Sequence, residues 1–195
     1  MSGGSPRREE LLTKAYAYVL DHGIGDLSLR PLAAAIDSSP RVLLYLFGSK
    51  DGLVRALLAK AREAELAFLR DSQPAAAADE RPVAPAAYDL PAVVRTTWAW
   101  LSPPELRPLL NLWLEAYAKS LVEPTGPWAT FAQDTVADWL TMLAAAQPPT
   151  HRDTEAGTAE RTLALATLRG ALLDLLATNG LARTTAAVTS AWPER

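Results

Sequence analysis

Hydrophobic positions along the chain recur with the spacing of α-helices and are separated by short polar or proline-containing breaks. In residues 6–22 one such stripe follows the i, i+3, i+4, i+7 spacing of a helix face, with Leu12, Ala15, Tyr16 and Val19. Residues 29–36 repeat that spacing. No stretch alternates polar and apolar residues for long enough to predict a β-strand. We therefore predict an all-α fold.

The helical pattern continues to the end of the chain. A long helix is predicted from its capping residue Ser49 to Arg70. Residues 73–87 are rich in Pro and Ala and are predicted to form a flexible connection. Breaks containing Pro, or Asn-Gly, then separate helices predicted at 89–101, 104–121, 127–146, 154–178 and 181–191. In total, the pattern predicts about nine to ten helices.

The N-terminal segment has the arrangement of a helix-turn-helix motif. One short helix is predicted to begin after Ser28, and another at Pro40, after the capping residue Ser39. Two short helices joined by a tight turn and packed on a longer first helix form this motif. The predicted domains are a helix-turn-helix domain at 1–53 and a second helical domain at 54–195.

The helix that begins at Pro40 contains an unusual apolar run. Residues 42–47 are all apolar or aromatic, although a helix turns only one face toward its core. Exposure of the remaining apolar face to water is unfavourable, so we expect this face to contact another molecule.

Composition narrows the possible classes of function. The chain has 195 residues, no cysteine, and two histidines, His22 and His151, without an H-E-x-x-H motif. It offers no nucleophile–base pair, glycine-rich phosphate loop or set of metal ligands, so an enzyme, a metal and a cofactor are not expected. It also has no apolar run long enough to span a membrane and no apolar signal-peptide core. We expect a cytoplasmic protein that does not interact with a membrane.

Charge is compatible with DNA binding by the first segment only. The net charge of −3 argues against a wholly basic coat for nucleic acid. The first 55 residues carry seven Lys or Arg and six Asp or Glu, whereas the remainder is acidic overall. This small asymmetry permits DNA binding without establishing it.

Residues 28–53, SLRPLAAAIDSSPRVLLYLFGSKDGL, resemble the DNA-binding signature of the tetracycline-repressor (TetR) family. The resemblance lies in four features, which are Leu32, Ala33 and Ala35, the Ser39 cap, the Leu43-x-Tyr45-x-Phe47 pattern and the Gly48-Ser49-Lys50-Asp51-Gly52-Leu53 segment. The remainder of the chain matches that family in helix count, spacing and length.

The resemblance implies that the helix from Pro40 lies in the major groove of double-stranded DNA, with Leu43 and Phe47 facing the protein core. Arginine can pair with guanine through two hydrogen bonds, and valine can pack on a thymine methyl group. The residues that match contacting positions of the family are Ser28, Arg30, Ser39, Pro40, Arg41, Val42, Tyr45 and Lys50. Alternatively, Arg41 and Lys50 are ordinary solvated charges and Tyr45 is a packing residue.

Four positions depart from the family pattern. Family members usually have Tyr in place of Leu44 and His or Tyr in place of Leu46, and those polar tips commonly contact phosphate. Asp37 replaces a usual Gly, and Ser38 replaces a usual apolar residue. Fewer phosphate contacts predict weaker and less salt-dependent DNA binding.

The resemblance also implies a small-molecule pocket in the second domain, where aromatic residues are concentrated. Five of the six tryptophans lie between residues 98 and 139, and large rings suit a mostly apolar pocket. The predicted ligand-binding residues are Trp98, Asn111, Trp113, Tyr117 and Phe131. We expect an apolar or aromatic ligand. Alternatively, the aromatic residues fill a core.

Two C-terminal segments, 127–146 and 154–178, are apolar on most sides and must therefore be buried on most sides. In a chain of this length, that pattern favours an interface between two copies of the chain. The predicted homodimer residues are Trp139, Leu165, Leu168, Leu172 and Leu175. The alternative is that both segments are internal helices of a monomer.

These observations lead to one hypothesis and one alternative. The hypothesis is a dimeric, ligand-responsive transcriptional regulator, a repressor that releases a pseudo-palindromic operator when a small molecule shifts the fourth helix, which carries Leu53 to Arg70. The alternative is a ligand-binding or adaptor protein of the same fold with weak or lost DNA binding.

Overall fold

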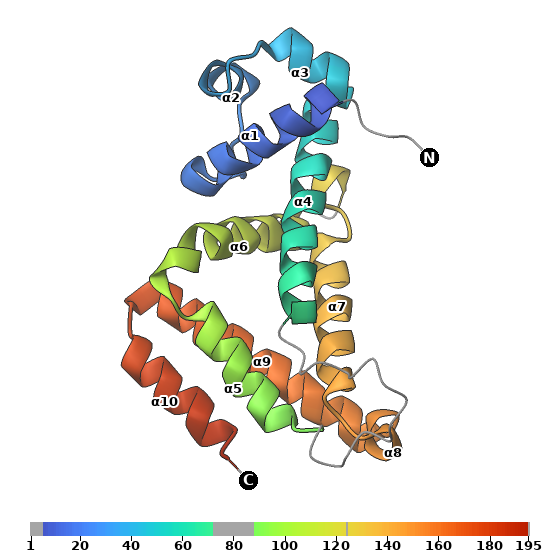
Figure 1. Ribbon diagram of the computed structural model, residues 1–195, viewed down its shortest axis with the longest axis vertical. Helices are drawn as coiled ribbons and strands as arrows, with labels where there is room; N and C mark the ends of the chain where they lie inside the picture. Colours follow the sequence, from blue (N-terminus) through green and yellow to red (C-terminus); the bar gives the residue numbers. More distant parts are fainter. Residues whose placement is uncertain (1–5, 72–87, 124, 195) are drawn as a thin grey trace. The chain divides into compact units, whose positions relative to one another are not determined.

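The computed structural model describes residues 6–71, 88–123 and 125–194. Over these residues the protein has ten α-helices, two short 3₁₀ turns and no β-strand (Figure 1). The predicted all-α fold is confirmed. The predicted connection at 73–87 lies outside the described residues.

The α-helices are α1 (Pro6–His22), α2 (Leu29–Ala35), α3 (Pro40–Phe47), α4 (Lys50–Asp71), α5 (Leu90–Leu101), α6 (Arg107–Val122), α7 (Phe131–Ala145), α8 (Pro149–Arg152), α9 (Glu155–Thr178) and α10 (Leu181–Ala191). The 3₁₀ turns are η2 (Pro104–Leu106) and η3 (Gly126–Trp128). Among the described residues, none of the helices is long and apolar enough to cross a lipid bilayer.

Helix starts follow local capping residues. Asp89 accepts a hydrogen bond from the Ala92 N–H at 3.0 Å at the start of α5, and Thr154 accepts one from the Gly157 N–H at 3.0 Å at the start of α9. The structure adds one helix that the pattern did not predict, α8, which begins at Pro149. Proline at the first helical position lacks only an N–H that would have no partner inside the helix, so this break starts a new turn of helix.

The chain divides into two compact units. Of the described residues, unit 1 contains those within Met1–Glu65 and Arg107–Thr135, and unit 2 contains those within Leu66–Leu106 and Val136–Arg195. Unit 1 therefore holds α6 together with α1 to α3 and most of α4, whereas the sequence predicted a domain boundary after residue 53. A long-range return of the chain joins α6 to this unit, and sequence spacing alone does not reveal such a return.

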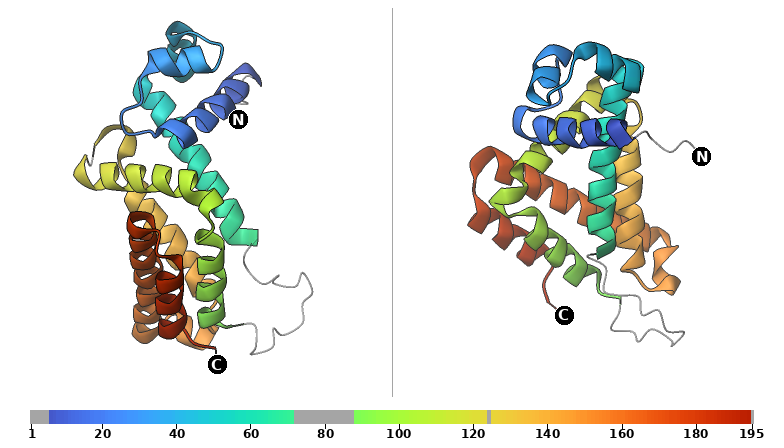
Figure 2. Two further views of the ribbon diagram at one scale, coloured as in Figure 1. Left: turned by 90° about the vertical axis from the view of Figure 1, so that its left-hand side faces the viewer. Right: turned by 45° about the horizontal axis from the view of Figure 1, so that its top comes forward.

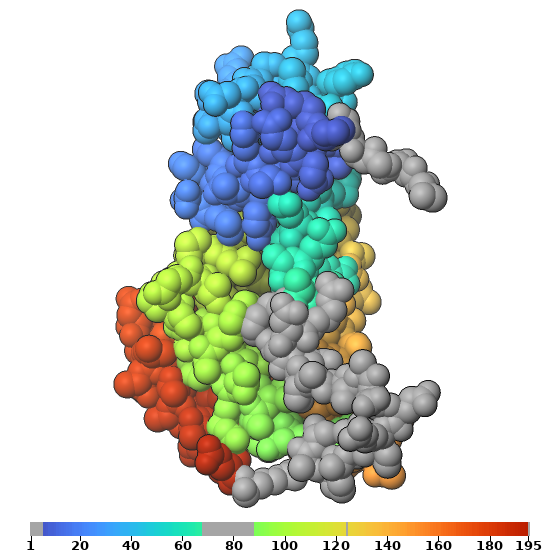
Figure 3. Space-filling model, in the orientation of Figure 1, coloured from blue at the N-terminus to red at the C-terminus, as the bar shows by residue number. Residues whose placement is uncertain are grey.

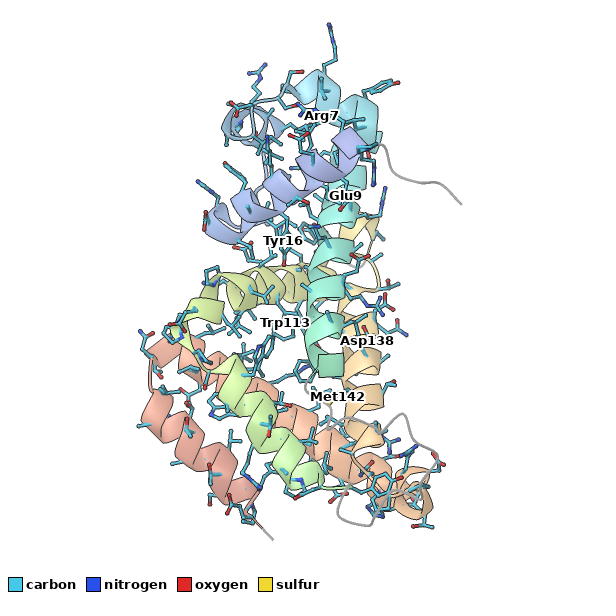
Figure 4. The ribbon with its side chains drawn as sticks, in the orientation of Figure 1. Arg7, Glu9, Tyr16, Trp113, Asp138 and Met142 are labelled. Carbon is cyan, nitrogen blue, oxygen red and sulfur yellow. The ribbon has the colours of Figure 1, made fainter. Side chains whose placement is uncertain are left out.

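The core of unit 1 is made by helices α1 to α4 and one face of α6, with Trp128 of η3 and Phe131 of α7. Leu11, Leu32 and Leu57 are fully buried within it, and α6 packs on α1 through its own buried Leu112 and Ala116. Two aromatic residues lie at the edge of this core, Tyr16 on α1 and Trp113 on α6 (Figure 4). Burial raises the pKa of the Tyr16 hydroxyl, and the negative charge of Glu65 adds to the shift.

In unit 2, α9 and α10 form a helical hairpin that packs on α5 (Figure 2). Asn179 ends α9 in the left-handed conformation, with a φ of 57°. Two hydrogen bonds join α5 to α10 and the residue that follows it. Trp98 Nε1 donates to Thr185 Oγ1 at 2.9 Å, and Arg95 donates to the Trp192 carbonyl at 2.9 Å.

A buried amide organises the corner of unit 2 between α7 and α9. Gln147 is 1% exposed, and its Nε2 donates to the Gly157 carbonyl at 2.9 Å and to Glu160 at 2.8 Å. Arg161 donates to Gln147 Oε1 at 3.3 Å, and His151 lies 3.1 Å from the same Glu160 carboxylate. A buried polar side chain with this many partners fixes one packing of the corner.

Candidate DNA-binding surface

Local residues define the start of α3. Asp37 lies in the left-handed region with a φ of 54°, which lets the chain turn after α2, and aspartate tolerates this conformation better than most residues. Ser39 Oγ then accepts a hydrogen bond from the Val42 N–H at 3.3 Å. Pro40 occupies the first helical position, where its fixed φ suits the helix.

The end of α3 is fixed in a similar way. Gly48 has a φ of 78°, and its N–H donates to the Leu44 carbonyl at 2.8 Å. Ser49 Oγ accepts a hydrogen bond from the Gly52 N–H at 2.9 Å, which caps the next helix, α4. Since both ends of α3 are held by backbone and side-chain contacts, its outer face has a defined orientation in unit 1.

The two faces of α3 differ sharply in exposure. Leu43 and Phe47, four residues apart, are 1% and 9% exposed and face the core of unit 1. Val42, Leu44 and Tyr45 are 38%, 41% and 85% exposed. Side chains from this part of the chain, coloured light blue to cyan, project from the surface of unit 1 (Figure 3). Part of the apolar run therefore lies on the surface.

The two leucines that depart from the family pattern have different environments. Leu46 is partly buried and packs against the core of unit 1, whereas Leu44 remains on the outer face. Ser38, another departure, has a buried hydroxyl with no hydrogen-bond partner among the described residues.

Three cations near α3 make no ion pair or hydrogen bond with any described residue. Arg30, Arg41 and Lys50 are all exposed. By contrast, Arg7 forms an ion pair with Glu10 at 2.8 Å, and Arg8 lies over the Phe47 ring, 4.8 Å from its centroid. Positive charges without an intramolecular partner are available to an anion such as a phosphate backbone.

Seven of the eight predicted DNA-contact residues lie on α2, on α3 or at their ends, and Lys50 is the first residue of α4. Seven are exposed, and Pro40 is half-buried. Ser39 uses its hydroxyl as a cap, whereas Ser28 occupies the capping position of α2 without making that hydrogen bond. The Ser28 hydroxyl is therefore free to meet another group.

Unit 1 also contains an acidic contact to the loop that precedes α2. Glu115 Oε2, on α6, accepts hydrogen bonds from the N–H groups of Ile24 at 2.7 Å and Gly25 at 3.0 Å. Gly23 has a φ of 80°, and a Cβ added there would lie 2.8 Å from Glu115 Oε1. The loop therefore needs glycine at this position, both for its backbone conformation and for the approach of the carboxylate.

A pocket of about 180 Å³ adjoins this contact. It is lined by Tyr18, His22, Gly23, Gly25, Asp26, Leu27, Ser28, Pro31 and Glu115. The Tyr18 and His22 rings stack with centroids 4.0 Å apart, and His22 Nδ1 donates to the Tyr18 carbonyl at 2.9 Å. Nearby, the Glu123 carboxylate raises the pKa of the Lys119 ammonium through a hydrogen bond and its charge, and Asp26 and Glu115 add to the shift.

The fold of the chain resembles several solved structures. The multidrug-binding protein EbrR, in its complex with imidazole, is 26% identical over 98% of this chain and 93% of EbrR, with a TM-score of 0.64. A TetR transcription regulator from Haloarcula marismortui ATCC 43049 is 19% identical over 95% of this chain and 94% of that one, with a TM-score of 0.69. A transcriptional regulator from Streptomyces coelicolor A3(2) is 20% identical over 97% of this chain and 100% of that one, with a TM-score of 0.65.

The chain has the fold of the TetR family. The resemblance that residues 28–53 show to this family is thereby confirmed. No family model matches the sequence, and no curated protein matches it. The structures named above are those of transcriptional regulators and a drug-binding protein.

Within this TetR fold, four of the five predicted ligand residues belong to unit 1. Trp113 and Tyr117 lie on α6 with ring centroids 5.0 Å apart, and both pack against the core of that unit. Phe131 is 7% exposed in the same core, and Asn111 is exposed. Trp98 belongs to unit 2, where it is 3% exposed and bound to Thr185. None of the five lines the pocket beside Glu115.

The predicted dimer residues lie inside unit 2. Trp139 and the four leucines Leu165, Leu168, Leu172 and Leu175 are each at most 6% exposed, so their own chain covers them. The outer face of α9 is instead apolar and exposed, with Leu163 at 61% and Leu173 at 47%. Ala166, Gly170 and Ala177 continue this outer stripe.

The Glu115 contact is expected to stabilise the loop before α2. Glu115→Ala should lower the free energy of unfolding by about 1–3 kcal/mol, because two backbone donors lose a charged acceptor. Hydrogen exchange at the Ile24 and Gly25 amides should accelerate more than exchange elsewhere in α1. Glu115→Gln, which keeps an oxygen acceptor, should have a smaller effect. Unchanged exchange at both amides in the alanine variant would contradict this prediction.

The sequence contained a weak sign of this contact, although only the structure reveals it. Two glycines, Gly23 and Gly25, stand in the loop between α1 and α2. A loop with two glycines can accommodate close approach of another chain segment, and this is the signal that points to Glu115.

Proposed function

We propose that the chain is a dimeric, ligand-responsive transcriptional repressor that binds a pseudo-palindromic operator through α3. The observation that carries this proposal is a set of three exposed, unpaired cations on consecutive helices, Arg30 on α2, Arg41 on α3 and Lys50 on α4, together with an exposed outer face of α3, a helix capped at both ends. An α-helix fits the major groove of B-DNA. The fold of the TetR-family structures supports the same role.

Each cation has a separate part in this proposal. Arg41, at the start of α3, pairs with the O6 and N7 atoms of guanine, which is the commonest specific contact of arginine in the major groove. Arg30 on α2 and Lys50 at the start of α4 contact phosphates on either side, which sets the register without reading sequence. The free hydroxyl of Ser28 donates to a phosphate oxygen.

A homodimer is supported by the outer face of α9. Leu163, Ala166, Gly170, Leu173 and Ala177 follow one another at intervals of three and four residues, the spacing of a helix–helix seam. An added Cβ on Gly170 would meet nothing in its own chain within 4 Å, so glycine leaves room for a second helix to approach. A symmetric dimer of helix-turn-helix proteins binds two half-sites that lie about 34–36 Å apart on the DNA.

The proposed effector is a small, flat aromatic molecule. EbrR, 25% and 24% identical to this chain in two further structures, is described in complexes with proflavin and with ethidium, both planar aromatic cations. In this chain, Trp113 and Tyr117 offer aromatic surface on α6, and Asn111 offers an exposed amide on the same helix. Aromatic walls with a few polar groups suit such ligands.

We propose that α6 and α4 carry the response to α3. Glu115 on α6 holds the loop before α2, and Asn111, Trp113 and Tyr117 lie on that same helix. A ligand that favours a different position of α6 would therefore change the strain on the loop before α2. A shift of α4, which follows α3 directly, would move the same motif. The effector favours the dimer state with lower operator affinity, which is a shift between two populations.

The function is tested by selecting operators from random duplex DNA with the purified protein at low salt, beside Arg41→Ala as control. Enrichment of a palindrome is expected for the native protein. On that palindrome the control should bind about 10- to 100-fold more weakly, the effect of losing one bidentate base contact. A folded dimer that enriches no sequence would contradict the proposal.

The second candidate is an adaptor of the same fold, and the exposed Leu44 favours it. An apolar side chain 41% exposed, where family members usually carry tyrosine, suits a protein partner as well as DNA. The selection separates the two functions, because an adaptor enriches no palindrome.

A further inference from the structure

We infer that the outer face of α3 recognises thymine C5-methyl groups through Val42 and Leu44, on either side of the base that Arg41 contacts. This inference rests on the proposed function, because it names the bases that the same surface reads. Val42 and Leu44 are then specificity-determining residues. Without such a contact they would be exposed apolar residues with no role in choosing the DNA sequence.

The helical geometry of α3 places Val42 and Leu44 on opposite sides of a row formed by Arg41 and Tyr45. At about 100° per residue, Arg41 and Tyr45 lie next to each other at the centre of the outer face. Val42 lies on one flank and Leu44 on the other. Their exposures agree with this placement, since Tyr45 is 85% exposed while Val42 and Leu44 are 38% and 41% exposed.

The chemistry of the two flanking side chains selects a methyl group. Val42 and Leu44 have no hydrogen-bonding group, so they cannot satisfy the donors and acceptors of base edges. In the major groove, the apolar group on a base edge is the thymine C5-methyl. Cytosine, guanine or adenine at the same place would leave a polar edge facing an aliphatic side chain, which is unfavourable without a water or a partner.

The charges around this face identify DNA as the occupant. Arg30, Arg41 and Lys50 have no anionic partner among the described residues. The exposed leucines of α9 differ in this respect. Arg183 on α10, the helix that packs on α9, is not an unpaired cation, because it forms an ion pair with Asp174 on α9 at 2.5 Å. An exposed apolar face on α3, with unpaired cations on α3 itself and on the helices before and after it, suits a polyanion that carries methyl groups in its groove.

The capped ends of α3 make discrimination between single methyl groups feasible. Ser39 and Gly48 hold the two ends of the eight-residue helix, and Leu43 and Phe47 fix its rotation against the core. Val42 is β-branched and therefore has restricted χ1 freedom in a helix. Side chains held in this way lose little conformational entropy on binding DNA. The favourable free energy of the methyl contacts therefore raises the affinity for DNA and is not spent on ordering the side chains.

The experiment replaces each thymine of the selected operator, one at a time, by deoxyuridine, which lacks only the C5-methyl group. Native protein should lose about fourfold in affinity per contacted methyl at two thymines of each half-site, one on each side of the Arg41 base. Leu44→Ala should weaken binding to the thymine operator and abolish the uracil effect at one of these positions. Val42→Ala should do the same at the other position.

If each variant abolishes the effect of uracil at one thymine position only, the side chain contacts that methyl group directly. A general loss of affinity would leave the effect of uracil unchanged at both positions. Both variants change exposed residues, and urea unfolding of the free proteins checks that they remain as stable as native. A selected operator on which no uracil substitution weakens binding would overturn this inference and leave the proposed function standing. If uracil lowers the affinity of native protein and of both variants by the same factor at every position, this inference is also overturned and the proposed function still stands. A selection that yields no operator would overturn the proposed function and this inference together.

Discussion

Leu173→Glu is expected to convert the proposed dimer into a monomer and to lower operator affinity by about 100- to 10,000-fold. Leu173 is 47% exposed on the outer face of α9, next to Gly170 in the stripe that we propose as the dimer seam. A carboxylate placed there would be buried against the second copy without a partner, which opposes association. A monomer then loses the gain in affinity from holding two half-sites at once. Sedimentation velocity and operator titration measure the two effects.

Leu121→Glu is the matched control for this experiment. Leu121 is also a leucine at the surface of one chain, 65% exposed, but it lies at the end of α6 in unit 1. The same change there should leave both the oligomeric state and the operator affinity unaltered. If Leu173→Glu remains dimeric, or if Leu121→Glu dissociates, the proposed interface on α9 is wrong.

Leu43→Ala is expected to lower the free energy of unfolding by about 2–5 kcal/mol, whereas Leu44→Ala should change it by at most about 0.5 kcal/mol. The two residues are neighbours on α3, but Leu43 is 1% exposed in the core and Leu44 is 41% exposed. Removing the first leaves a cavity in unit 1, and removing the second leaves only solvent. Urea unfolding of the two variants beside native protein measures the difference.

These neighbouring variants also separate stability from DNA recognition. Leu44→Ala should weaken operator binding while the free protein remains as stable as native. Leu43→Ala should weaken binding only to the extent that the protein is unfolded. Equal destabilisation by the two substitutions would mean that Leu44 is covered in the free protein, contrary to its exposure in the structure.

Most helix boundaries could be predicted from the sequence because they depend on local residues. The span predicted for α1 agrees with the structure, and so does that of α3, because Ser39, Pro40 and Gly48 act within a few residues of where they stand. The departures are similarly local. The start of the segment predicted at 104–121 is a 3₁₀ turn, and the Pro148-Pro149 break starts α8.

The orientation of α9 could not be predicted, because the sequence contains two stripes with equal spacing. Leu165, Leu168, Leu172 and Leu175 form one, and Leu163, Ala166, Gly170, Leu173 and Ala177 form the other. The stripes start two residues apart, so they lie on nearly opposite faces of the helix. Periodicity identifies a helix that is apolar all round but does not choose its inner face. The packing of α5 and α10 makes that choice in the folded chain.

The sequence by itself determined the all-α fold, the helix-turn-helix motif and the family resemblance, since each depends on residues close together in the chain. Tertiary structure decided which of Leu44 and Leu46 remains exposed, which face of α9 is free, and that Glu115 holds a loop about 90 residues away in the sequence. These features depend on which segments of the chain pack together. Local propensity and hydrophobic spacing specify what each helix can bury, and only the packed fold determines what it does bury.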